Sequence, residues 1–433
     1  MQIAKRLPFF RQAYRLVNVL AQREHLPRSE IASLQLESIN RVWQHAITYV
    51  PHYRQVSLKM NLPKEFKSLD EYTSTVPILQ KTAVRESTIL SERPSRGRWI
   101  YTGGSTGIPL AMFRDKRADL EMSSCQYRSR AIWGVDIFDR TAMLWGHGGP
   151  FGSGLSGAVA KLRRGIEDSL RNRVRFSAYR LGKQDLDQYL REMKEFAPVL
   201  LYGYSSALYL LALEALESRT SFDSLKLVVL TSELVTDDIR DTVQRAFRTN
   251  VVGEYGAAEC QLIAYEDNQH LLRVREDLVM VETLPTQDNY YRIIISVLNN
   301  PSFPLLRYDI GDLADRPLDQ PGTGFAILPP IIGRNNDFLI SRSGRRVRVD
   351  AHIVEHHPSI KRFTAHQFSN GKVVLLLEVD SQARNFNVNN MRKKLSSLLD
   401  GQNVEVELTE NIPPTAPGKH RWVISELSQS MVS

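Results

Sequence analysis

The stretch Tyr101-Thr102-Gly103-Gly104-Ser105-Thr106-Gly107-Ile108-Pro109 is the most informative part of the chain. Its three glycines let the backbone approach an anion without interference from a Cβ atom, and its hydroxyl and backbone N–H groups can donate to anion oxygens. The apolar residues Trp99 to Tyr101 suit a β-strand, whereas Pro109 prevents a helix from following directly. No Gly-Lys-Ser/Thr follows, so this is not a Walker A loop. The stretch predicts a phosphate-binding loop, with a polar surface turn as the alternative.

The length and composition of the chain limit its class. A chain of 433 residues exceeds the usual size of one hydrophobic core and predicts two or more domains. Its net charge of +8 favours anionic ligands such as nucleotides or coenzymes, and no basic motif with interleaved aromatic residues indicates nucleic acid. The two cysteines, Cys125 and Cys260, exclude a disulfide framework and predict a reducing, cytoplasmic compartment.

The first segment, residues 1–28, is basic and amphipathic. Its uninterrupted apolar runs are too short to span a bilayer or to form the apolar part of a secretory signal. The segment predicts a helix that makes a peripheral membrane contact, or one that docks on the protein's own body or on a second subunit to form a dimer.

An alternation of short apolar runs and helical stretches occupies the middle of the chain. Strands are predicted at Thr141–Trp145, Val199–Tyr202 and Leu225–Leu230, and helices at Gln184–Phe196 and Ser205–Glu217. This alternation is typical of an α/β fold in which helices cover a mostly parallel sheet.

A second loop, Val251-Val252-Gly253-Glu254-Tyr255-Gly256-Ala257-Ala258-Glu259, follows a two-valine strand. Ligands of open α/β sheets bind beyond the carboxyl ends of strands, where Tyr255 could lie on a base and Glu259 could hold a hard cation. The alternative is an exposed glutamate beside a packed tyrosine. Further along, Asp312 follows a glycine and could accept hydrogen bonds from ribose hydroxyls.

A smaller segment closes the chain. A polar turn at Ile331–Phe338 predicts a linker, and strands, a helix and a kinked tail follow it. The tail, Pro413–Arg421, carries Lys419, a residue type that is usually solvated when it lies on a loop. The predicted strands and helix of this segment are Lys372–Val379, Val404–Leu408 and Asn389–Leu399.

In this order, these motifs resemble those of the adenylate-forming superfamily of acyl-CoA synthetases, nonribosomal peptide adenylation domains and luciferases. The resemblance is to its phenylacetate–CoA ligase and CapK-type branch, and it covers residue 33 to the end of the chain. It is carried by the motifs VWQHAITYVPHYRQ, VPILQKTAVRES, TGGSTGIP, LYGYSSAL, EYGAAE, LLRYDIGDLA, GRNNDFLISRSGRRV and PPTAPGKHR.

The resemblance implies a large multi-part α/β adenylation domain with a smaller, mobile α+β C-terminal domain. The implied boundaries are an N-terminal helical extension over residues 1–32, the adenylation domain over residues 33–334, a hinge at residues 335–336 and the C-terminal domain over residues 337–433.

The activity implied is ATP-dependent conversion of a carboxylic acid into an acyl-AMP with release of pyrophosphate. Lys419 would bridge the carboxylate and the α-phosphate, and Glu259 would hold Mg²⁺. Asp312 would fix the ribose, Tyr255 would pack on adenine, and Arg334 would contact ribose or phosphate. The ATP-binding residues implied are Thr102, Gly103, Gly104, Ser105, Thr106, Gly107, Ser232, Glu233, Glu254, Tyr255, Gly256, Asp312 and Arg334, and the catalytic residues are Lys419 and Glu259.

The acid is expected to contact Trp145, His147, Tyr204 and Ser205, because the acyl group of this superfamily lies beside the strand and loop before the tyrosine motif. Flat aromatic rings beside glycines leave room for a ring, and the polar groups offer hydrogen bonds that an aliphatic acid cannot use. A polar or aromatic acid is therefore expected rather than a long fatty acid. In the alternative interpretation, Trp145 is a packed residue at the end of the sheet and His147 is a loop histidine without a ligand.

The acceptor of the acyl group would be CoA, a carrier protein or an amine. CoA phosphates could bind a basic run, although such a run is more often a solvated face. Its members are Arg342, Arg345, Arg346 and Arg348.

Three residues depart from the pattern of the superfamily. Ile108 stands where a lysine is common, Ala258 where a threonine is usual, and Asn336 where the hinge commonly has aspartate or lysine. These departures keep a degenerate nucleotide-binding regulator as an alternative. A further alternative is transfer of AMP to a hydroxyl acceptor, because CapK-type relatives resemble adenylyltransferases.

Overall fold

The computed structural model describes most of the chain. The predicted phosphate loop with Ile108, and also His147, Asn336 and Lys419, lie outside the described residues. The described ranges are 8–86, 88–101, 110–146, 165–334, 338–347, 349, 360–379, 387–412 and 422–427.

The central sheet of the large domain has, within the described residues, seven strands in the order β4-β3-β5-β6-β7-β8-β9. The pairings from β4 through β7 are parallel, and β8 and β9 are added antiparallel. Every residue of β5 and β6 is buried, as expected for strands covered on both faces. The strands are β3 (Thr141–Trp145), β4 (Arg173–Ser177), β5 (Leu200–Tyr204), β6 (Leu227–Thr231), β7 (Asn250–Ala257), β8 (Gln261–Glu266) and β9 (Leu272–Val274).

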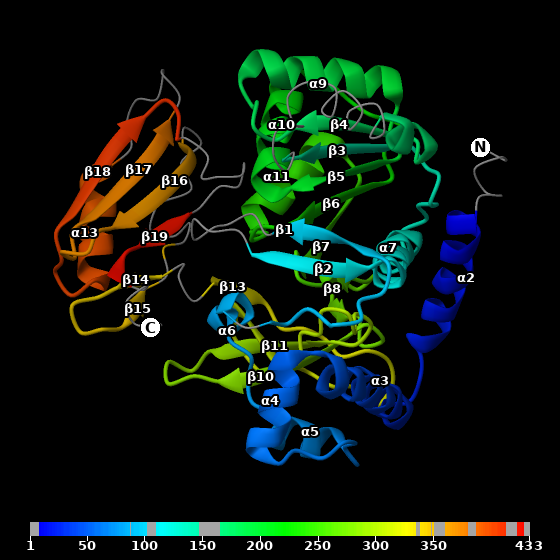
Figure 1. Ribbon diagram of the computed structural model, residues 1–433. Helices are drawn as coiled ribbons and strands as arrows, with labels where there is room; N and C mark the ends of the chain where they lie inside the picture. The colour runs from blue at the N-terminus through cyan, green and yellow to red at the C-terminus, as the bar shows by residue number, and fades with distance from the viewer. Residues whose placement is uncertain are drawn as a thin grey trace, which may run out of the picture.

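Helices cover both faces of this sheet, which confirms the predicted α/β class (Figure 1). On one face, α9 (Lys183–Phe196), α10 (Ser205–Glu217) and α11 (Asp237–Phe247) pack with the strands in one hydrophobic core. On the other face, α7 (Lys116–Ala131) places Arg130 over the ring of Tyr202. The helix predicted at Ser205–Glu217 is α10, and its Ala- and Leu-rich sequence explains why it is buried almost all round.

A second, antiparallel sheet packs against the helices that begin the chain (Figure 1). Trp43 of α3 and Tyr53 of α4 anchor this contact, because the Tyr53 hydroxyl donates to the Pro304 carbonyl over 2.9 Å. The helices are α3 (Arg28–Tyr49), α4 (Pro51–Met60), α5 (Leu69–Thr75) and α6 (Lys81–Glu86). The strands, in sheet order, are β10 (Val279–Pro285), β11 (Tyr291–Val297), β12 (Tyr308–Ala314) and β13 (Ile331–Arg334).

The hairpin of β1 (Gly97–Tyr101) and β2 (Ala111–Asp115) flanks the predicted phosphate loop. The strand predicted at Trp99 to Tyr101 is therefore confirmed as part of β1. Tyr101 pairs with Ala111, so the chain leaves and re-enters the hairpin at neighbouring positions on either side of residues 102–109.

The C-terminal domain is a separate α+β unit with its own core (Figure 1). Its main sheet has the order β18-β17-β16-β19, and α13 contributes Met391 and Leu395 to the core. The elements are β14 (Leu339–Ile340), β15 (Arg346–Val347), β16 (Ile360–Gln367), β17 (Val373–Val379), α13 (Val388–Leu398), β18 (Val404–Thr409) and β19 (Val423–Ser425).

The N-terminal helix α2 (Pro8–Arg23) lies against α7 of the same chain (Figure 1). Phe10 packs on Phe138 with ring centroids 4.7 Å apart, and the Tyr14 hydroxyl donates to the Asp136 carboxylate over 2.7 Å. The prediction that this segment docks on the protein's own body is confirmed for α2, and a membrane or dimer contact stays a prediction. No helix within the described ranges is long and apolar enough to cross a membrane.

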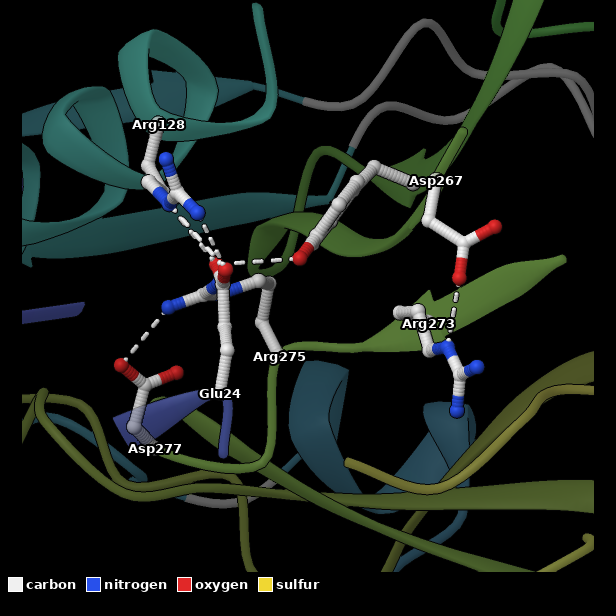
Figure 2. A network of polar contacts seen from close by, with 7 residues as sticks. Glu24, Arg128, Asp267, Arg273, Arg275 and Asp277 are labelled. Atoms are coloured by element: carbon white, nitrogen blue, oxygen red, sulfur yellow. Dashed lines mark hydrogen bonds and ion pairs between the residues drawn. The ribbon is translucent and has the colours of Figure 1, made fainter. Parts of the chain in front are cut away.

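A buried polar network fixes the chain directly after α2 (Figure 2). Glu24 accepts from Arg128 over 2.7 Å, from Arg275 over 2.6 Å and from the Tyr265 hydroxyl over 3.0 Å. Arg275 has no exposed surface and also donates to Asp277 over 2.9 Å. Two carboxylates therefore compensate a fully buried guanidinium, which joins the N-terminal helix to the interior of the large domain.

Candidate functional site

The carboxyl ends of β3, β5, β6 and β7 meet at one edge of the central sheet, and five of the predicted site residues lie there. Trp145 ends β3, Tyr204 ends β5, Ser232 and Glu233 follow β6, and Tyr255 lies in the last part of β7. This is the edge at which open α/β sheets bind ligands.

Tyr255 and Asp312 come from different sheets and meet directly. The Tyr255 hydroxyl donates to the Asp312 carboxylate over 2.6 Å. Asp312 pairs with Arg334 across β12 and β13, although the Arg334 side chain lies outside the described residues. The structure thus connects three residues from separate predicted motifs, each assigned to the nucleotide, through one side-chain hydrogen bond and one strand pairing.

Glu259 is the buried carboxylate of this edge, with 8% of its surface exposed. The Tyr308 hydroxyl donates to Glu259 Oε1 over 3.2 Å, and Lys81 Nζ of α6 lies 4.0 Å from the same oxygen. Burial, and then the negative charge of Glu259, raise the pKa of Tyr308, so its hydroxyl stays protonated as a donor. Sequence reasoning quoted the motif around Lys81 but did not assign this lysine to the site.

The loop that carries Glu259 has little freedom to move. A Cβ on Gly256 would lie 1.7 Å from the Gln261 carbonyl oxygen, so only glycine fits there. The Arg114 guanidinium donates to the Ala258 carbonyl over 2.5 Å, and burial lowers the pKa of Arg114. The backbone directly before Glu259 is therefore held by a buried guanidinium.

Glu254 and Glu233, both predicted to bind the nucleotide, make contacts inside the protein. Glu254 is buried, accepts from Ser129 Oγ over 3.0 Å and lies 3.8 Å from Arg130 Nε, and burial raises its pKa. Glu233 accepts the Ser206 N–H over 2.8 Å at the first turn of α10. A nucleotide contact by Glu254 would have to come from its backbone, because its carboxylate faces α7.

An aromatic group occupies the same edge beside β3 and β5. The Trp145 ring stacks on Tyr202 at 5.4 Å and packs on Tyr204 at 4.5 Å. Burial raises the pKa of Tyr204, which keeps its hydroxyl neutral. Ser205 is fully buried, and within the described part of the chain its hydroxyl has no hydrogen-bond partner. The Ser205 hydroxyl is therefore a buried polar group at this end of the sheet whose hydrogen-bonding capacity is unused among the described residues.

The residues around Glu259 can be compared with the needs of a divalent cation. Within the described ranges, no group of three or more His, Cys, Asp or Glu side chains could hold a metal ion. Mg²⁺ at nucleotide sites is usually held by one or two carboxylates, with phosphates and water completing its shell. The single carboxylate of Glu259 fits a Mg²⁺ that arrives together with ATP.

Comparisons with known proteins agree with this geometry. No model of a known protein family matches the chain. The chain is 27% identical over 431 residues to the protein CapK of Staphylococcus aureus, with 92% of this chain and 90% of that protein covered. It is 26% identical over 340 residues to phenylacetate–coenzyme A ligase of Thermus thermophilus, with 74% of each chain covered. Its sequence is thus similar to CapK and to phenylacetate–CoA ligase, and this similarity supports the CapK and phenylacetate–CoA ligase branch of the adenylate-forming superfamily.

This chain has a fold that solved structures share. It aligns with 2-hydroxyisobutyryl-CoA ligase in the postadenylation state, in complex with 2-HIB-AMP, at a TM-score of 0.73 and 18% identity, over 95% of this chain and 93% of that one. In its thioesterification state the same ligase aligns at 0.61 over equal shares. The chain as a whole therefore superposes better on the postadenylation structure than on the thioesterification structure.

Proposed function

We propose that this adenylate-forming ligase activates a polar or aromatic carboxylic acid with ATP and then transfers the acyl group to a thiol or amine acceptor. The observation that supports it best is the convergence of Tyr255, Asp312 and Glu259 at the carboxyl edge of the sheet. One residue offers a ring for a base, one a carboxylate for a ribose and one a carboxylate for a cation.

The chemistry at this edge is a problem of charge. The carboxylate of the acid and the α-phosphate repel one another unless positive charge lies between and around them. Lys81, close to Glu259, and Lys419, from the C-terminal domain, would supply that charge. When bound, Mg²⁺ would neutralise phosphate charge beside Glu259. The residues Thr102 to Gly107 would donate backbone N–H groups to the pyrophosphate that leaves.

The acid would bind beside the aromatic group. Trp145 and Tyr204 provide flat apolar surfaces, and the Ser205 hydroxyl offers a hydrogen bond that within the described residues is unused. His147, also predicted here, lies outside the described residues. An acid with a ring or a hydroxyl group fits this combination better than a long alkyl chain.

The acceptor is proposed to be CoA, with a carrier protein or an amine as the alternative. The names of phenylacetate–coenzyme A ligase and 2-hydroxyisobutyryl-CoA ligase support CoA. The basic run gives it little support, because Arg345 donates to Asp400 over 2.8 Å and Arg346 lies 3.5 Å from Asp288. We also propose a cytoplasmic location, which two free and buried cysteines support.

The test is acid-dependent release of pyrophosphate from ATP across a panel of uronic, aromatic, fatty and amino acids. We expect an aromatic or hydroxylated acid to give the highest kcat/KM, and hydroxylamine to trap the acyl-AMP as a hydroxamate. A hydroxylamine-resistant AMP conjugate would instead indicate transfer of AMP to a hydroxyl group. ATP binding without turnover on any acid would indicate a nucleotide-binding regulator. Thioester formation measured with CoA, cysteamine and amines identifies the acceptor.

A further inference from the structure

Strand β16 of the C-terminal domain holds the chain on both sides of residues 413–421. On one side, the Ile412 N–H donates to Glu378 over 2.9 Å and its carbonyl accepts from Arg362 over 3.3 Å. On the other side, the Trp422 carbonyl accepts the Ala365 N–H over 2.8 Å. Arg362 and Glu378 form an ion pair in which each side chain is 8% exposed. Ile412 is therefore held by the paired strands β16 and β17, and Trp422 is held by β16.

The Trp422 side chain connects the two domains. Its indole packs on Phe363 of β16, with ring centroids 4.9 Å apart, and belongs to the edge of the C-terminal core. It also packs on the large-domain core formed by α9, α10, α11 and the central sheet. Among the described residues, it is the one apolar side chain that packs on both of these cores.

Two further contacts between the domains, both among described residues, lie near the linker in the sequence. Phe338 packs on Tyr290 at 5.8 Å, and Arg346 lies 3.5 Å from Asp288. Both reach the turn between β10 and β11. Trp422 contacts a different part of the large domain, so it fixes the rotation of the C-terminal domain in a way that contacts next to a linker cannot.

We propose that Trp422 is a positioning residue that holds the C-terminal domain in the arrangement used for adenylation of the acid. The proposal rests on the proposed function, because Lys419, three residues before Trp422, is the lysine expected at the α-phosphate. An indole that packs on the large domain in one arrangement and loses this contact in another shifts the population toward the first. Aromatic packing of this kind is worth a factor of about three to ten in that population.

The test separates the two half-reactions in Trp422→Ala. Acid-dependent pyrophosphate release from ATP measures the first, and thioester formation from supplied acyl-AMP and CoA measures the second. We expect the first to fall about three- to tenfold and the second to stay equal or rise. Small-angle X-ray scattering should show a larger radius of gyration for the variant. The matched control is Leu408→Ala, which removes an exposed apolar side chain of the same domain and should change neither rate nor scattering.

Equal loss in both half-reactions with unchanged scattering would show a purely structural role and overturn the proposal, as would unchanged rates. If Trp422→Ala does not fold, Trp422→Leu keeps apolar bulk on the C-terminal core. The rates of pyrophosphate release and of thioester formation are then compared in Trp422→Leu in the same way. Absence of pyrophosphate release from the wild-type protein on every acid would be a failure of the proposed function instead. In that case the scattering curves of the wild-type protein and of Trp422→Ala test whether Trp422 holds the domains together. Identical curves would show that it does not.

Discussion

At the scale of single residues, Lys81 is the one that the structure adds to the predicted site. Lys81→Ala should lower kcat/KM for acid-dependent pyrophosphate release about tenfold, because a positive charge near Glu259 is lost. Its side chain is 35% exposed, so the free energy of unfolding should change by less than about 1 kcal/mol. Lys59→Ala, which removes an exposed lysine from α4, is the control for loss of charge alone. Equal kinetics of the two variants would remove Lys81 from the site.

Asp312 allows a second test at this scale. Asp312→Asn should weaken ATP binding about tenfold or more, because the amide accepts fewer hydrogen bonds from ribose and pairs less well with the Tyr255 hydroxyl. Isothermal titration with ATP in the absence of acid measures this directly. Asp315→Asn, three positions further along the chain, is the control. An unchanged dissociation constant for Asp312→Asn would place the ribose elsewhere.

The candidate site could be predicted from sequence at positions where the residue type and its neighbours are uncommon outside a binding site. The tyrosine and the carboxylate of two glycine-containing stretches, Tyr255 and Asp312, were assigned to one nucleotide, and the structure places them on β7 and β12 and joins them by a hydrogen bond. Lys81 was not assigned, because a lysine on a short helix looks like an ordinary solvated side chain until the fold places it beside Glu259. The alternation of β7 turns the Glu254 side chain toward α7, which a list of loop residues does not show.

At the scale of elements, the parallel part of the fold was predictable because its signal is local. Continuous apolar runs gave β3, β5 and β6, and the Ala- and Leu-rich stretch gave α10. The antiparallel sheet from β10 to β13 was not predicted. Hydrophobic periodicity can indicate a strand, but it does not show with which other strand it pairs. The same holds for α2. Its amphipathic sequence predicts a buried face, but only the fold shows that this face contacts Phe138 and Asp136.

The junction after α2 carries a stability prediction. Glu24→Ala removes the carboxylate that accepts from Arg128, Arg275 and Tyr265, and leaves the buried Arg275 paired with Asp277. Loss of one partner from a buried ion pair costs about 3 kcal/mol or more in free energy of unfolding. The urea midpoint should therefore fall, whereas Glu30→Ala, at an exposed position in α3, should leave it unchanged. Equal midpoints would mean that α2 is not held by this network.

At the scale of the whole molecule, the proposed reaction divides its residues between two domains with separate cores. Tyr255, Asp312 and Glu259 belong to the large domain, and Lys419 belongs to the sequence of the small one. Nucleotide binding and acyl-AMP formation should therefore be separable by mutation. This separation distinguishes an enzyme from a nucleotide-binding regulator, the alternative that Ile108, Ala258 and Asn336 keep open.

Lys419→Ala tests this separation. Acyl-AMP formation should fall about 10²-fold or more, because a charge aimed at the transition state is lost, while ATP binding by the large domain should change little. Thermal unfolding should be close to that of the wild-type protein, because loss of one loop lysine removes little stability. The measurement is single-turnover formation of acyl-AMP with the best acid, alongside ATP titration of the same sample. Wild-type rates for Lys419→Ala would rule out this lysine as the bridge between the carboxylate and the α-phosphate, even if the acid is activated.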